Sequence, residues 1–152
     1  MNNWQMSALA FLQTGNPFTV FAGIDLNGDG INNDRPDLAD AGILGHGVFN
    51  NPNSPMPRSA FNGAVQPRRI GNLGRNTFRR DGIVSTDFAL VKRFPIPLHE
   101  RMELEFRCEF FNLFNTPRFG PPVSTLTSSS FGQVQSQEND PRRIRFVLKL
   151  SF

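Results

Sequence analysis

The sequence predicts an all-β protein whose strands separate an apolar environment from a polar one. The chain has 152 residues, the length of one domain, and its 13 glycines and 12 prolines leave little room for helices of ordinary length. Two segments alternate strictly between apolar and polar residues, which is the period of a β-strand. The longest purely apolar run, residues 8–12, is far shorter than the roughly 20 residues of a spanning helix, whereas a spanning strand needs only about 9–11.

The alternation is clearest in segments 102–113 and 144–152. In the first, Glu103, Glu105 and Glu109 share one face, and apolar side chains such as Phe106 form the other. In the second, every even-numbered position is apolar: Ile144, Phe146, Leu148, Leu150 and Phe152. Segments 84–94 and 4–13 alternate less regularly. We therefore expect four strands, at about 4–13, 84–94, 102–113 and 144–152.

The connections between these strands are very unequal in length. Residues 95–100 form a short turn, whereas residues 15–82 and 115–140 form long loops. Short turns on one side and long loops on the other are typical of a bacterial outer-membrane barrel, with the turns periplasmic and the loops extracellular. The charged face of each strand is then expected to line a wet interior and to pair across strands. A soluble β-sandwich would show the same alternation and remains an alternative.

Four strands are too few to close a barrel by themselves. An open sheet would present unpaired backbone groups to lipid, where each one costs several kcal/mol. The first residues, Met1–Gln5, also lack the basic and apolar regions of a signal peptide. Both observations lead us to expect that residues 1–152 are the C-terminal fragment of a larger barrel protein.

Six stretches of the sequence carry a resemblance to a known family. They are WQMSALAFLQTGNPFTV (4–20), DLNGDGINNDRPD (25–37), GNLGRNTFRRDG (71–82), STDFALVKRF (85–94), RMELEFRCEFFNLFNTPRFG (101–120) and DPRRIRFVLKLSF (140–152). Together they resemble the C-terminal end of TonB-dependent receptors of the Oar-like kind, and the resemblance covers nearly the whole chain.

The resemblance implies a 22-stranded outer-membrane barrel that imports a bulky ligand with energy relayed by TonB. This chain would supply the last four strands, with its C-terminus in the periplasm. TonB would act only through an N-terminal plug region that is missing from these residues. The final strand resembles the signal that the barrel assembly machinery reads, carried by Phe146, Leu148, Leu150 and Phe152.

The segment Asp25-Leu26-Asn27-Gly28-Asp29-Gly30 matches the opening of a calcium-binding loop. The match fails at the twelfth position, where Pro36 replaces the usual glutamate. If calcium binds, the expected ligands are Asp25, Asn27, Asp29, the carbonyl oxygen of Ile31, and Asp34. The alternative is a cluster of asparagine-glycine turns with solvated aspartates.

Residues 58–80 contain six arginines and no acidic residue. Five of them, Arg68, Arg69, Arg75, Arg79 and Arg80, are candidates for contact with a ligand or with the phosphates of lipopolysaccharide, or for pairing with aspartates of neighbouring loops. Between residues 68 and 80 the one aromatic residue is Phe78, so these arginines lack a stacking platform and we expect no nucleic-acid partner.

The sequence offers no catalytic site. His46 and His99 lack a nucleophile or metal-ligand partner at a recognisable spacing, and the single Cys108 is expected to be a small buried apolar side chain. We therefore expect no enzymatic activity and no cofactor other than the candidate calcium. Three classes stay open: an outer-membrane receptor fragment, a soluble calcium-stabilised β-domain for adhesion or binding, and a basic nucleic-acid-binding domain. The first is favoured.

Overall fold

The computed structural model describes residues 3–46, 52–53, 55–63, 69–97 and 102–152. The chain divides into two compact units. The strand unit comprises Met1–Gln13, Ile83–Pro117 and Asn139–Phe152, and the loop unit comprises Thr14–Gly82 and Arg118–Glu138.

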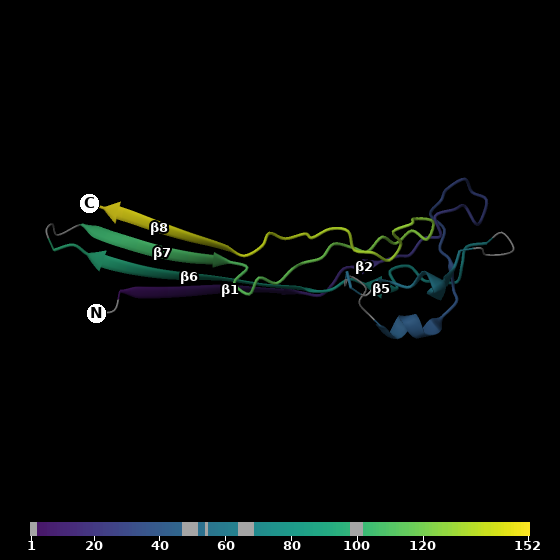
Figure 1. Ribbon diagram of the computed structural model, residues 1–152, viewed down its shortest axis with the longest axis horizontal. Helices are drawn as coiled ribbons and strands as arrows, with labels where there is room; N and C mark the ends of the chain where they lie inside the picture. Colours follow the sequence, from purple (N-terminus) through teal and green to yellow (C-terminus); the bar gives the residue numbers. More distant parts are fainter. Residues whose placement is uncertain (1–2, 47–51, 54, 64–68, 98–101) are drawn as a thin grey trace. The chain divides into compact units, whose positions relative to one another are not determined.

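The strand unit is a four-stranded antiparallel sheet with the order β1-β6-β7-β8 (Figure 1). Its strands are β1 (Trp4–Gln13), β6 (Ile83–Pro95), β7 (Glu103–Phe111) and β8 (Arg143–Ser151). These bounds differ from the ranges expected from the sequence by at most two residues at either end. The prediction of an all-β chain with antiparallel strands is confirmed.

The register places the strand ends that lead into the long connections at one end of the sheet. There Gln13 of β1 faces Ile83 of β6, and Phe111 of β7 faces Arg143 of β8. At the opposite end Pro95 faces Glu103. Just beyond it the backbone N–H of Ile96 donates to the carbonyl oxygen of Met102, at 2.9 Å. The short and long connections therefore leave opposite ends of the sheet, as their lengths predicted.

The motif EFFNLFN ends β7 through its two asparagines. Asn112 and Asn115 both adopt left-handed backbone angles, with φ of 53° and 52°, which asparagine tolerates better than most residues. The backbone N–H of Asn112 donates to Asp87 Oδ1 at 2.9 Å, and the side-chain oxygen of Asn112 accepts from the N–H of Thr116 at 2.9 Å. These bonds satisfy backbone groups that leave the sheet ladder at this point.

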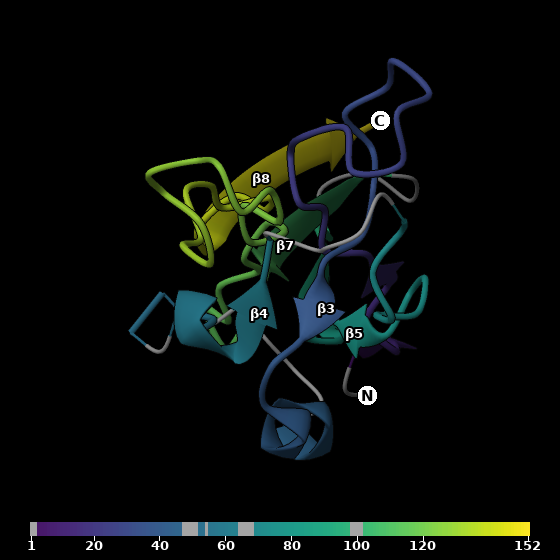
Figure 2. The same ribbon diagram turned by 90° about the vertical axis from the view of Figure 1, so that its right-hand side faces the viewer.

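The loop unit contains short elements that the sequence analysis did not predict. β2 (Pro17–Phe18) pairs with β5 (Phe78–Arg79), and β3 (Asp37–Leu38) pairs with β4 (Phe61–Asn62), which lie side by side in Figure 2. Two 3₁₀ helices, η1 (Ala41–His46) and η2 (Arg58–Ala60), complete the regular structure in the described part of this unit.

These elements enclose a hydrophobic core. Its buried members are Val20, Ile43, Met56, Ala60, Phe61, Leu73, Phe78, Leu126 and Phe131. Phe61 is central, because its ring meets those of Phe78 and Phe131 edge-on, with centroids 5.8 and 5.7 Å apart. The long connections are therefore packed structures, not the unstructured loops that the sequence alone suggested.

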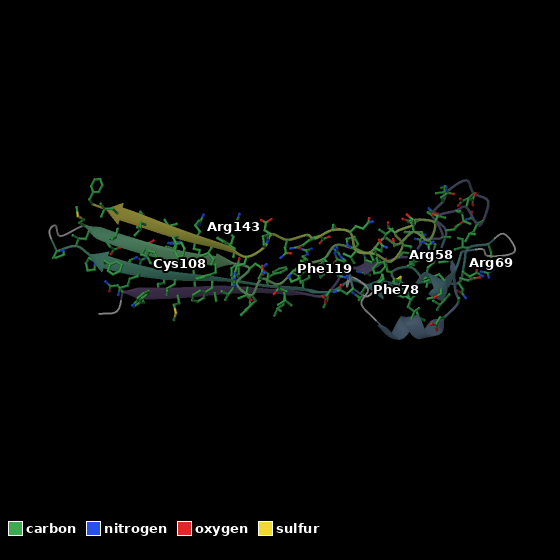
Figure 3. All side chains as sticks on the ribbon, viewed as in Figure 1. Arg58, Arg69, Phe78, Cys108, Phe119 and Arg143 are labelled. Carbon is green, nitrogen blue, oxygen red and sulfur yellow. The ribbon has the colours of Figure 1, made fainter. Side chains whose placement is uncertain are left out.

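Both long connections contribute to this one core. Arg58 donates from its guanidinium to the carbonyl oxygens of Leu126 and Ser128, and Phe21 exchanges backbone hydrogen bonds with Ser124 and Leu126, each at 2.9 Å (Figure 3 labels Arg58). Arg80 also pairs with Glu138 at 2.7 Å. Residues 14–82 and 118–138 thus stabilise each other.

Candidate functional site

One face of the four-stranded sheet is apolar and remains uncovered. Cross-strand pairs align apolar residues in rows, such as Ala8, Phe88, Phe110 and Ile144. On β8 the side chains of Phe146 and Leu148 are 67% and 70% exposed. Uncovered apolar surface of this extent marks a face that contacts lipid or a partner.

Lys92 interrupts this face near one end, on the strand whose alternation is less regular in the sequence. Its Nζ lies 4.8 Å from the ring centre of Trp4 and 5.6 Å from that of Phe94. A lysine between two aromatic rings is stabilised by cation–π attraction and resembles the belt at a membrane–water interface, where a long side chain can reach water. The sequence already contains the signal for this position, because Lys92 is two residues after Leu90 and therefore shares its face of the strand.

The opposite face carries a ladder of ion pairs. Arg93 contacts Glu105 at 3.0 Å, Arg107 contacts the same carboxylate at 3.2 Å, and Arg145 contacts Glu109 at 2.7 Å. These pairs join β6, β7 and β8, so the expectation of cross-strand pairing on the polar face is confirmed. Because Cys108 is buried within the sheet, its predicted role as a small buried side chain is confirmed as well.

The polar face has an apolar patch on β1. Leu9 faces Asp87 across the strand pair, and Phe11 faces Ser85. Both apolar side chains are more than half exposed. The apolar–polar division is therefore sharp on β7 and β8 and weaker on β1, as the weak alternation of residues 4–13 indicated.

The segment expected to bind calcium is a tight turn built on Asp25. Its Oδ1 accepts from the N–H of Gly28 at 2.6 Å, and its Oδ2 accepts from the N–H of Gly30 at 2.8 Å. Both glycines have φ near +87°, which favours glycine. The two N–H groups, that of Gly30 first, lower the pKa of Asp25 below its ordinary value because they stabilise the charged carboxylate.

The other expected calcium ligands also bond to the backbone of this turn. Asn27 Oδ1 accepts from the N–H of Asp29 at 2.9 Å, and Asp29 Oδ1 accepts from the N–H of Ile31 at 2.8 Å. Asp34 is only 2% exposed, and its Oδ2 accepts from the N–H of Leu26 at 2.6 Å. Among the described residues, no three acidic, histidine or cysteine groups gather as a metal site would require. Calcium binding stays a prediction, to be checked by titrating the protein with calcium in a calorimeter.

The arginine segment divides into paired and unpaired side chains. Arg69 forms a two-pronged pair with Asp37, at 3.0 and 2.7 Å, and Arg79 donates to the carbonyl oxygen of Gly15 at 3.2 Å (Arg69 is labelled in Figure 3). Arg80 is held by Glu138, as described above. Pairing with aspartates of the loops, one of the expected alternatives, thus accounts for Arg69, whereas the partner of Arg80 is a glutamate.

Arg75 has no hydrogen bond or ion pair to any residue in the described ranges, and Arg68 and His99 lie outside those ranges. Contact of this segment with a ligand or with lipopolysaccharide stays a prediction.

A comparison with protein families supplies the class of the molecule. The model of a family described as "Outer membrane beta barrel domain" matches residues 1–145, nearly the whole chain. The chain belongs to this outer membrane β-barrel family. No curated protein and no solved structure matches it.

Family membership agrees with a sheet whose two faces differ in polarity, one carrying the exposed Phe146 and Leu148 and the other the ion-pair ladder. Separately, no helix in the part of the chain that the structure describes is long and apolar enough to cross a membrane.

Proposed function

We propose that this chain forms part of the wall and the surface loops of a TonB-dependent outer-membrane receptor of the Oar-like kind, which binds a bulky ligand and imports it. The observation that carries the proposal is a sheet with one uncovered apolar face and one ion-paired face, in a chain of the outer membrane β-barrel family. The resemblance of the motifs at 71–82 and 101–120 supports the finer assignment.

The sheet edges support a larger barrel. Within the described residues, β1 and β8 each have a single neighbour in the sheet. The outer backbone groups of both strands would be unsatisfied in lipid, at a cost of several kcal/mol each. Further strands on both sides, bringing the total to 22 in this receptor class, would remove both edges.

The same proposal gives the chain an orientation and partners. The end of the sheet that leads into the loop unit faces the cell exterior, next to lipopolysaccharide, and the turn after β6 and the C-terminus face the periplasm. The apolar face meets outer-membrane lipid. Phe146, Leu148, Leu150 and Phe152 present the signal for the barrel assembly machinery, and TonB acts through an N-terminal plug.

Cysteine labelling tests this orientation. In a Cys108→Ser background, Ser129→Cys places a thiol at an exposed position of the loop unit, and Pro97→Cys places one in the short turn. A membrane-impermeant maleimide is expected to label the Ser129→Cys protein in intact cells and the Pro97→Cys protein only after the outer membrane is opened. The Cys108→Ser protein without an added cysteine is the control, and the reverse labelling pattern would overturn the orientation.

Import is tested in cells. Deletion of the receptor and deletion of TonB are expected to abolish growth on the same large nutrient in a panel of substrates, and the intact receptor is expected to restore it in the first strain only. If every nutrient that requires TonB is still used without the receptor, the import proposal is wrong, and the orientation is judged independently by the labelling.

A further inference from the structure

A pocket of about 380 Å³ lies within the loop unit. Three chain segments line it, represented by Thr19, Arg35 and Arg75. Its volume falls in the range of about 300–1,000 Å³ that small-molecule sites occupy. The sequence alone did not predict this pocket. Arg35 lies in an acidic segment, far along the chain from the five arginines between residues 68 and 80.

Hydrogen bonds hold the three segments in place. The N–H of Ala22 donates to the Asp34 carbonyl oxygen at 2.7 Å, and the N–H of Gly71 donates to the Arg35 carbonyl oxygen at 2.8 Å. The N–H of Asn76 donates to Thr19 Oγ1 at 2.9 Å. Since each wall is tied to another, the pocket is formed before any ligand arrives.

Gly71 permits the closest of these approaches. A β-carbon at this position would lie 2.1 Å from the carbonyl carbon of Pro36, inside any allowed contact distance. Only glycine therefore lets the segment that carries Ile70 and Arg75 run against the segment that carries Arg35. This contact therefore helps to place both Arg35 and Arg75 in the lining of the same pocket.

The pocket has an excess of unpaired positive charge. Arg35 and Arg75 make no ion pair with any residue in the described ranges, in contrast to Arg69 and Arg80. The Nε of Arg35 is buried and has no hydrogen-bond partner there. The one acidic lining residue, Asp34, already accepts backbone N–H groups from Leu26 and Asn27.

A buried guanidinium N–H without an acceptor is costly, and arginine cannot give up its proton to reduce that cost. An oxyanion in the pocket would instead bind the other N–H groups of Arg35 and those of Arg75, because two oxygens of a carboxylate or phosphate match the fork of a guanidinium. Asn33, Asn76 and Thr19 add neutral polar groups, and Phe21 and Ile70 offer apolar surface for the remainder of a ligand.

We infer that this pocket binds a small soluble oxyanion, a carboxylate or a phosphate, through the guanidinium groups of Arg35 and Arg75. The inference goes beyond the proposed function, because this anion is a second ligand, distinct from the bulky one that the receptor would import. The volume of about 380 Å³ suits a small acid, whereas the phosphates of lipopolysaccharide are carried on a bulky lipid.

Binding is measured by calorimetry on the outer-membrane protein that contains this chain, purified in neutral detergent. The soluble probes are citrate and inorganic phosphate, and lipid A in mixed micelles represents the lipid source. We expect at least one soluble probe to bind, and Arg35→Gln with Arg75→Gln to weaken that binding by at least about tenfold. The control Arg142→Gln removes one positive charge at an exposed position outside the pocket and should leave the affinity unchanged.

Three results would overturn the inference: no binding of either soluble probe, binding of lipid A alone, or equal weakening by Arg142→Gln. The melting temperature of each variant shows whether it is folded, and Arg35→Lys, which keeps the charge but loses the fork, provides a second variant with an expected intermediate affinity. Because the assay needs neither TonB nor cells, its failure leaves the import experiment untouched.

Discussion

The strand unit and the loop unit use the same apolar residue types in opposite ways. Phe146 of β8 is 67% exposed on the sheet, whereas Phe78 of β5 is 1% exposed in the core of the loop unit. The loop unit buries its phenylalanines against one another and so resembles a small soluble domain. The strand unit leaves them outward, which is favourable only where the surrounding medium is itself apolar.

Among the tests of this contrast, removal of an aromatic ring from the core of the loop unit should have the largest effect on stability. Phe78→Ala should destabilise the loop unit by about 3–5 kcal/mol, because it removes a buried ring that packs between Phe18 and Phe61. Phe146→Ala, the matched change on the uncovered face, should cost much less in detergent or lipid. Limited proteolysis of the loops against denaturant concentration measures both variants. Equal losses would remove the distinction between the two units.

A charge placed on either face of β1 tests the lipid assignment directly. Ala8→Arg, at the middle of the strand on the apolar face, should cost about 2–4 kcal/mol in a bilayer. Leu9→Arg, one residue further on, would place its charge opposite Asp87 on the polar face and should cost close to nothing. Urea unfolding in lipid vesicles compares them. A similar cost for both variants would argue against lipid on one face.

The strands were predictable from the sequence because alternation is a local signal. Residues 144–152 show it without interruption, and β8 occupies Arg143–Ser151. Lys92 is the exception: it is a charged side chain on the apolar face, beside the ring of Phe94 on its own strand and the ring of Trp4, which the pairing of β1 with β6 brings next to it.

The loop unit was not predictable because its contacts are long-range. Val20, Phe78 and Phe131 lie far apart along the chain and share no period, and strands of two residues are too short to show one. The Arg69–Asp37 pair likewise joins residues 32 positions apart. Of the candidate site residues, the turn at Asp25 and the pairing of Arg69 with a loop aspartate were among the expected alternatives, and the pocket at Arg35 was not.

Glycine substitutions distinguish a packed loop unit from a flexible one. Gly71→Ala should destabilise it by about 1–3 kcal/mol, since the new β-carbon would overlap the backbone of Pro36. Gly45→Ala, in η1, meets nothing within 4 Å and should stay within about 0.5 kcal/mol of the parent protein. Thermal unfolding of the loop unit measures the difference. Indistinguishable variants would mean that residues 70–76 do not hold the contact with residues 35–36 in solution.

The smallest expected effect is a dependence of loop-unit stability on acid. The hydrogen bonds from Arg69, and then that from the N–H of Asn72, lower the pKa of Asp37 below its ordinary value of about 3.9. A carboxylate with a lowered pKa in the folded state stabilises it above that ordinary value, and the contribution is lost as the pH falls through the folded-state pKa.

Loop-unit stability should therefore decrease below about pH 4 in the parent protein. It should decrease less steeply in Asp37→Asn and in Arg69→Gln, and the double variant should add little to either. Denaturant unfolding between neutral and acidic pH measures these slopes. The strand unit provides the internal reference, because neither substitution touches its ion-pair ladder; a change in its unfolding would show that the two units do not respond separately.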